Sequence, residues 1–148
     1  MRGASALALI AVALLAGACG GGDDGDGPSE ADRAEAVVRD QLRAIEDENA
    51  ADFCATLTPE YARTFTRQIA GATSSELKDC PAAFSKARSL SDSPTFEGRD
   101  IAGQDIDEID FHTNVDGSTA AVEGPRRVAR YELVQQGGEW KVNRAKAN

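Results

Sequence analysis

The sequence is poor in the residues on which most catalytic and metal-binding sites depend. Its 148 residues include one histidine, His112, and three cysteines. A zinc site needs several closely spaced Cys or His ligands, and the sequence has no such cluster. It also has no nucleophile motif, and the glycine-rich residues 20–27 lack the lysine and the following helix of a phosphate-binding loop. The sequence therefore predicts no metal and no cofactor.

Positive charge is also scarce. The chain has 16 Lys and Arg against 25 Asp and Glu, which gives a formal net charge of -9. Such an acidic chain lacks the basic surface that binds nucleic acid, so no nucleic-acid partner is expected. Anionic lipid headgroups would repel it, so any contact with a membrane would depend on an anchor.

Long apolar runs are limited to one, at residues 4–18. This run is shorter than the roughly 20 residues that a transmembrane helix needs, and no second run of that length follows. Arg2 precedes the run, and small residues and Cys19 end it. A basic start, a short apolar run and a small-residue boundary are typical of an export signal.

The boundary sequence Leu14-Leu15-Ala16-Gly17-Ala18-Cys19 resembles the lipobox of bacterial lipoproteins. In that family a diacylglycerol is attached to the cysteine sulfur, and the signal is cut just before it. The resemblance implies a signal peptide at residues 1–18, lipidation of Cys19, and a place on the extracytoplasmic face of the cell membrane. The alternative is an ordinary secretory signal cut after Ala18, with Cys19 incidental.

The mature chain divides into a tether and one domain. Residues 19–28 are mostly Gly and Asp, which cannot bury apolar area and behave as a flexible tether. Residues 29–148 suit a single domain. With Cys19 assigned to the lipid, Cys54 and Cys80 are expected to form a disulfide in an oxidising compartment. Closing this loop of about 27 residues would stabilise the fold by about 3 kcal/mol in the chain-entropy model.

The first half of the domain has helical periodicity. Apolar residues recur at three- and four-residue steps over residues 29–49, and shorter helical patterns follow over residues 51–57, 58–71 and 73–90. The expected starts and stops are Ser29, Thr58-Pro59-Glu60, Gly71, a capping box of Thr73 and Glu76, and Asp79-Cys80-Pro81.

The second half alternates with a period of two. One edge strand is expected within residues 95–104, followed by a hairpin over 108–122 that turns at Asp116-Gly117. A second hairpin over 127–144 turns at Gly137-Gly138. Helices followed by an antiparallel meander predict an α+β domain whose N-terminal helices pack on one face of a curved antiparallel sheet.

Four segments carry a resemblance to a known family: the end of the first helix at residues 44–49, residues 53–60, the hairpin at 115–122, and the closing Tyr131-Glu132-Leu133-Val134 … Gly137-Gly138-Glu139-Trp140-Lys141-Val142. Together they resemble the NTF2-like (SnoaL-like) superfamily over residues 31–146, and in particular exported members from high-GC Gram-positive bacteria. The resemblance implies a cone with a pocket between the helices and the concave sheet face. Members include dehydratases, isomerases, polyketide cyclases and transport factors, and the enzymes place His, Asp or Tyr in the pocket.

Three residues are the candidates for catalysis. If the polar face of its strand lined the cone, His112 with Asp110 would form an acid–base pair, and Tyr131 would donate to a developing oxyanion. The alternative places His112 and Asp110 on a solvated strand face, with Tyr131 and Trp140 in the core.

Two charged groups have weaker functional interpretations. The acids at 100, 105, 107, 108 and 110 lack the glycine and the distal glutamate of a calcium loop, which favours a solvated edge. The cluster of Arg126, Arg127 and Arg130 would bind a carboxylate or phosphate, or pair with nearby acids.

Taken together, these patterns favour a membrane-anchored envelope lipoprotein without enzymatic activity. We expect it to bind either a small apolar ligand in the cone or an envelope protein through its sheet, and self-association through the sheet is a further expectation. The alternative is a pocket enzyme of the cyclase, isomerase or dehydratase kind.

Overall fold

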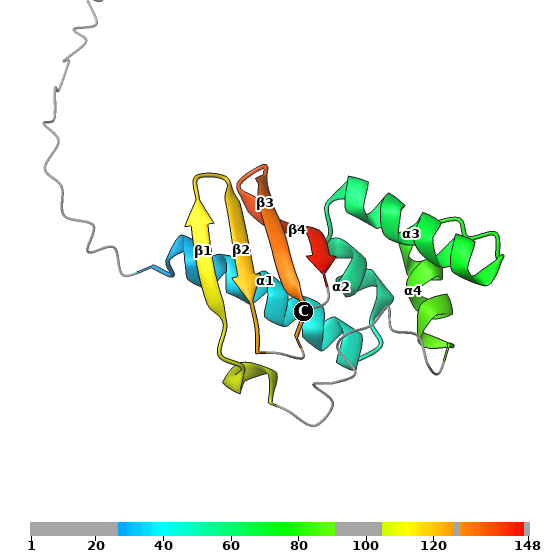
Figure 1. Cartoon of the computed structure of the whole chain (residues 1–148), viewed down its shortest axis with the longest axis horizontal. Coiled ribbons are helices and arrows are strands. Elements are labelled where there is room, and N and C mark those ends of the chain that lie inside the picture. Colours follow the sequence, from blue (N-terminus) through cyan, green and yellow to red (C-terminus); the bar gives the residue numbers. More distant parts are fainter. Residues whose placement is uncertain (1–26, 91–104, 126–127, 147–148) are drawn as a thin grey trace, which may run out of the picture.

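The computed structural model describes residues 27–90, 105–125 and 128–146. The described chain is an α+β domain in which four α-helices precede a four-stranded antiparallel sheet (Figure 1). This confirms the expected class and the order of helices and strands. The edge strand expected within residues 95–104, Arg126 and Arg127 lie outside the described residues.

The four helices begin at side-chain caps that the sequence signals. Helix α1 (Glu30–Glu46) has a complete capping box, in which Ser29 and Asp32 bond each other's backbone N–H groups. Helix α2 (Ala50–Ala55) is capped by Asn49, α3 (Pro59–Thr73) by Thr58, and α4 (Cys80–Arg88) by Asp79. Each cap oxygen accepts a hydrogen bond from a backbone N–H that has no partner inside the helix.

Two of the predicted helix signals between α3 and α4 are wrong. Gly71 does not end α3, which continues to Thr73 and stops at Ser74 in the left-handed conformation, with φ of 49°. An exposed glycine inside a helix costs only about 1 kcal/mol, so it does not have to break one. Thr73 is not a cap either, because its hydroxyl donates to the Ile69 carbonyl oxygen at 2.7 Å within α3.

The sheet is a meander with strand order β1-β2-β3-β4. Its strands are β1 (His112–Asp116), β2 (Thr119–Glu123), β3 (Arg130–Gln136) and β4 (Glu139–Lys146). Two-residue turns join β1 to β2 and β3 to β4, and the glycines Gly117, Gly137 and Gly138 all have positive φ there. Both hairpins therefore form where the sequence predicted them.

The first strand is shorter than its alternating pattern suggests. Residues 109–111, which were expected in the strand, lie before β1, and Ile106–Glu108 form a turn of 3-10 helix, η2. The Asp105 side chain accepts from the Asp107 N–H at 2.9 Å and so caps this turn. Arg39 of α1 donates to the carbonyl oxygens of Ile106 and, at 2.9 Å, of Ile109, which holds the segment against α1 before β1 starts.

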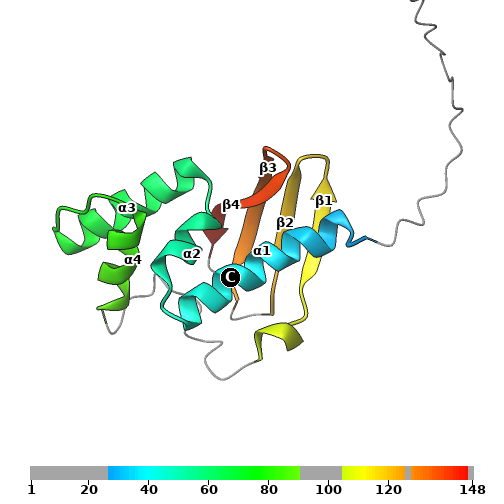
Figure 2. The same cartoon turned by 180° about the vertical axis from the view of Figure 1, so that it is seen from behind.

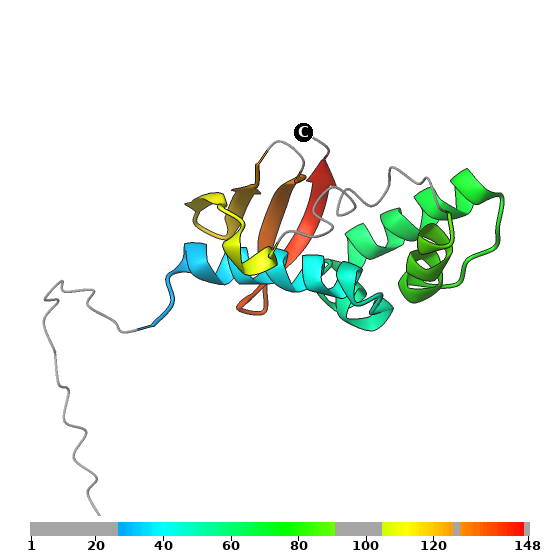
Figure 3. The same cartoon turned by 90° about the horizontal axis from the view of Figure 1, so that it is seen from below.

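The helices do not all pack on the sheet. Helix α1 crosses one face, as Figure 2 shows from behind, whereas α3 and α4 lie beyond the β4 edge (Figures 1 and 3). A disulfide joins Cys54 of α2 to Cys80 of α4, the pairing expected from the sequence, with their Cα atoms 6.0 Å apart. The prediction of helices layered on one sheet face thus holds for α1 and fails for α3 and α4.

The helical end of the domain has its own apolar centre. The ring of Phe53 lies 5.3 Å from that of Phe65 and 4.8 Å from that of Phe84, so one aromatic side chain from each of α2, α3 and α4 meets there. Aromatic contacts of this kind add to the stabilisation from burial. The aromatic centre and the disulfide fix α3 and α4 to α2.

Candidate functional site

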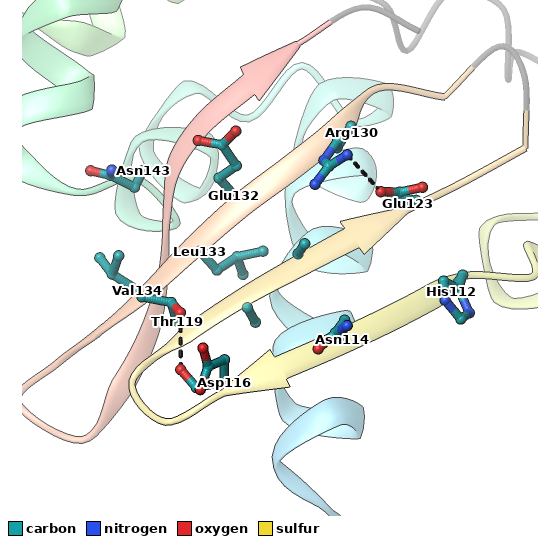
Figure 4. Close-up of a pocket in the computed structure, with 12 residues that line it drawn as sticks. His112, Asn114, Asp116, Thr119, Glu123, Arg130, Glu132, Leu133, Val134 and Asn143 are labelled. Atoms are coloured by element: carbon teal, nitrogen blue, oxygen red, sulfur yellow. Dashed lines mark hydrogen bonds and ion pairs between the residues drawn. The ribbon is translucent and has the colours of Figure 1, made fainter.

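One face of the sheet is left without a helix over it in the described part of the chain. Because side chains alternate along a strand, the residues that do not face α1 all project from this open face. It carries a hollow of about 470 Å³ that spans the four strands, with His112 and Asn114 along β1, Thr119 on β2, and Glu132 and Asn143 toward the far edge (Figure 4). Eight of the twelve lining residues have polar or charged side chains, so this surface suits a hydrated contact with another molecule.

Opposite charges are paired across the strands of the open face. Arg130 bonds Glu123 at 2.9 Å, and Lys146 bonds Glu132 at 2.6 Å. The hydrogen bond from Lys146 and the positive charges of Lys146, Arg144 and Arg130 lower the pKa of Glu132, against the opposing effect of burial. The Arg130 side chain thus pairs with a nearby acid, which was one of the two interpretations of the arginine cluster.

The hollow continues toward the helical end. A second hollow between α3 and β4 shares Glu132 and Asn143 with the first and is closed on its other side by Glu60 and Tyr61. The Tyr61 hydroxyl accepts from the Ala145 N–H at 3.1 Å, so α3 is attached directly to β4 at this point. The polar surface therefore runs from β1 across the sheet to α3.

The three candidate catalytic residues are not brought together. His112 and Asp110 are both exposed, and His112 lines the open face. Tyr131 lies between Arg130 and Glu132 on β3 and points to the opposite face, where it is 4% exposed within the core. An acid–base pair and an oxyanion donor must reach one substrate atom, and this arrangement separates them by the thickness of the sheet.

The space between α1 and the sheet is occupied by side chains. Val38 and Leu42 of α1 belong to the same buried cluster as Val122, Leu133 and Val142 of the sheet, and each of these is 0–1% exposed. Trp140 belongs to this cluster as well, and its Nε1–H donates to Glu30 at 2.9 Å. These contacts are those of a packed core, which is where the resemblance implied a pocket.

Two long-range polar contacts escaped the sequence analysis. Glu30, at the start of α1, accepts from both Trp140 and Gln135, and so connects the entry of the chain into the domain with β3 and β4. Arg39 holds the segment before β1 and lies over the Phe111 ring, 4.8 Å from its centroid. Neither contact has a local signal, because the partners are 67 to 110 residues apart in the chain.

The acidic run has structural roles in its described part. Asp105 caps η2, and Asp107 pairs with Arg43 of α1. Among residues 27–90, 105–125 and 128–146, no group of three or more His, Cys, Asp or Glu side chains is placed to hold a metal ion. Asp100 lies outside the described residues.

Comparison with known proteins adds no relative. The chain matches no protein-family model, no curated protein and no solved structure. Within the described residues, no helix is both long and apolar enough to cross a membrane.

Proposed function

We propose that this protein is a lipid-anchored domain of the cell envelope that binds a protein partner through the open face of its sheet and performs no catalysis. The observation that carries the proposal is the contrast between the two sheet faces. One is filled by α1 and the buried cluster, and the other carries two adjoining hollows, lined mainly by residues with polar side chains, from β1 to α3. A polar surface with paired charges suits a hydrated protein interface better than it suits a small apolar ligand.

The anchor is supported by the sequence at the start of the chain. The lipobox-like segment before Cys19 and the Gly and Asp residues after it are the parts that a tethered domain requires. A disulfide between Cys54 and Cys80 fits an oxidising compartment outside the cytoplasm. Cys19 then has a role distinct from that of the other two cysteines.

The NTF2-like assignment belongs to this proposal. Its support is the order of elements, with a long first helix across one face of an antiparallel meander and a closing hairpin at Gly137-Gly138. The register shift between Glu132 and Leu133 is an irregularity of the β-bulge kind, which bends a strand and increases its twist. The packed interior supports a comparison with non-enzymatic members of that superfamily.

Membrane fractionation tests the anchor. We expect Cys19→Ser to move the protein from the membrane fraction to the soluble fraction, because the thiol that takes the lipid is gone. The matched control is the double variant Cys54→Ser/Cys80→Ser, which removes the other two thiols and should stay with the membrane. A Cys19→Ser protein that remains in the membrane fraction would overturn the anchor.

Photo-crosslinking in native membranes tests the binding face. A photoreactive residue at Asn143 or Ala121, both on the open face, should give an adduct with one discrete envelope protein. The same residue at Glu76, an exposed site between α3 and α4, should not. Identical adducts from all three positions, or adducts from Glu76 alone, would contradict binding through the open face.

A further inference from the structure

The two edges of the sheet are treated differently by the rest of the domain. At the β4 edge, the connection between α2 and α3 covers the strand: the Val142 N–H donates to the Thr56 carbonyl at 2.8 Å, and the Thr58 N–H donates to the Val142 carbonyl at 2.9 Å. At the β1 edge, no described residue bonds the outward backbone groups of the strand. Unpaired strand edges are templates for pairing with another strand.

The register identifies which backbone groups of β1 point outward. The Ser118 carbonyl accepts from the Gln135 N–H at 2.9 Å, so Ser118 directs its backbone toward β3. By alternation, Thr119 and Ala121 direct theirs toward β1, where they face Asp116 and Asn114. The residues in between, Thr113 and Val115, therefore present their N–H and C=O groups at the β1 edge, where no described residue pairs with them.

We propose that β1 pairs antiparallel with β1 of a second copy of this chain, around a two-fold axis at Asn114. In this register Thr113 of each copy exchanges both backbone hydrogen bonds with Val115 of the other, which uses the outward groups of the two strands. Asn114 then faces Asn114 of the second copy as a non-hydrogen-bonded pair, the kind in which side chains approach most closely.

Side-chain complementarity favours this occupant. The same register places His112 opposite Asp116 of the second copy, and Asp116 opposite its His112, on the open face of the joined sheet. Each strand carries one imidazole, which has an N–H donor, and one carboxylate acceptor at equal distances from Asn114, so the strand is complementary to itself. Donor–acceptor pairs directly across a strand pair are stabilising, whereas like charges are destabilising.

The geometry also suits a membrane-tethered protein. A two-fold axis perpendicular to the sheet keeps both copies of α1 on the same side, so both chains enter their domains from that side. Glu35 in the second turn of α1 accepts from the Thr113 hydroxyl at 2.7 Å, which places the early part of α1 at the β1 edge. Tethering raises the local concentration that a small strand-to-strand contact needs.

Disulfide trapping in the full chain tests the register. With Asn114→Cys, the Cα atoms of the two new cysteines lie about 4.5 Å apart in the proposed pair, within reach of a disulfide. Mild oxidation of membranes should then give a covalent dimer. The matched control is Ala121→Cys, the partner of Asn114 on β2, whose copies lie about three strand spacings, or roughly 14 Å, apart and should not cross-link.

Substitutions at His112 and Asp116 test the pairing of these two residues across the dimer. Both side chains are exposed, so the substitutions should leave the fold intact. In the Asn114→Cys background, His112→Asp places two carboxylates opposite one another and should lower cross-linking by about tenfold. Asp116→Lys removes the acceptor opposite the imidazole and should lower cross-linking by a smaller factor. Mixing the two variants, marked with different tags, should restore cross-linking between unlike chains, because the introduced aspartate of one chain then faces the introduced lysine of the other. Equal trapping by Asn114→Cys and Ala121→Cys, or no recovery on mixing, would overturn the proposal.

The dimer and the partner proposed for the open face are detected at different positions. Adducts at Asn143 report on the face near β4, whereas trapping at Asn114 reports on the β1 edge, so a loss of adducts at Asn143 would leave trapping at Asn114 unchanged. The two results therefore separate an interface at the strand edge from an interface on the sheet face.

Discussion

The helical end of this domain and its sheet are held together by different means. At the helical end, a disulfide and three phenylalanine rings fix α2, α3 and α4 to one another. In the sheet, stability comes from aliphatic packing of α1 on β2, β3 and β4, with Glu30 and Arg39 as long-range polar contacts. The Cys54–Cys80 disulfide thus lies in the helical end, on the side of the molecule away from β1 (Figure 1).

The difference between the helical end and the sheet indicates which surfaces of this small domain can bind a partner. The helical end covers the β4 edge through Thr56, Thr58 and Tyr61, which bond the N–H and C=O groups of Val142 and the N–H of Ala145. The open face and the β1 edge carry no such cover in the described residues. The disulfide-stabilised end therefore covers one edge, and the opposite edge is the one at which we propose pairing with a second copy.

Removing the disulfide should have the largest effect on this contrast. We expect Cys54→Ser/Cys80→Ser to lower the free energy of unfolding by about 2–4 kcal/mol, because the unfolded chain regains the freedom of the closed loop. Urea unfolding followed by circular dichroism measures it. As the control, a reducing agent should destabilise the parent protein and leave the double variant unchanged; equal stability of the two proteins without reductant would show that α4 is held by packing alone.

Removing the Glu30 carboxylate should have a smaller effect, located at the sheet. Glu30→Ala leaves the Trp140 Nε1–H, in a side chain only 4% exposed, without its acceptor, at a cost of about 1–2 kcal/mol. Trp140 is the single tryptophan, so its emission reports this site directly. Glu30→Gln keeps a side-chain oxygen acceptor and should recover most of the loss; a Gln variant as unstable as the Ala variant would assign the effect to the charge at the start of α1 instead.

Local signals explain why the secondary structure of this domain could be predicted well. Ser29, Thr58 and Asp79 cap the helices that follow them, as expected, and the glycine pair at 137–138 forms its turn; the cap of α2 at Asn49 was not predicted. A cap or a tight turn depends on a few neighbouring residues, so the sequence is sufficient to find it. Gly71 misled the prediction because packing of Ile69 into the core outweighs the low helix propensity of one exposed glycine.

The placement of the helices and the nature of the site could not be predicted in the same way. Whether α3 packs over the sheet or beyond β4 depends on contacts such as Tyr61 to Ala145, which are 84 residues apart. The alternation around His112 identified a polar strand face, but only the position of α1 shows that this face is the open one. Periodicity defines the two faces of a strand and does not say which one will be covered.

Removing the ion pair between Glu132 and Lys146 on the open face should have the smallest effect on stability. Its pH dependence distinguishes this contribution from the other two. Hydrogen bonding and attraction by Lys146 lower the pKa of Glu132 below its ordinary value of 4.5. A carboxylate with a lowered pKa stabilises the fold above its unfolded pKa and loses that contribution as pH falls through the folded pKa. At pH 7, Glu132→Gln should therefore be less stable than the parent by under about 1 kcal/mol, because the pair is partly exposed.

The difference in stability between Glu132→Gln and the parent should shrink below pH 4.5, and also at high salt, which screens exposed charges. Asp32, whose pKa is also lowered through its bonds with Ser29, is unchanged by this substitution and cancels in the comparison. A difference that persists at low pH would mean that Glu132 stabilises the sheet through packing of its side chain and not through Lys146.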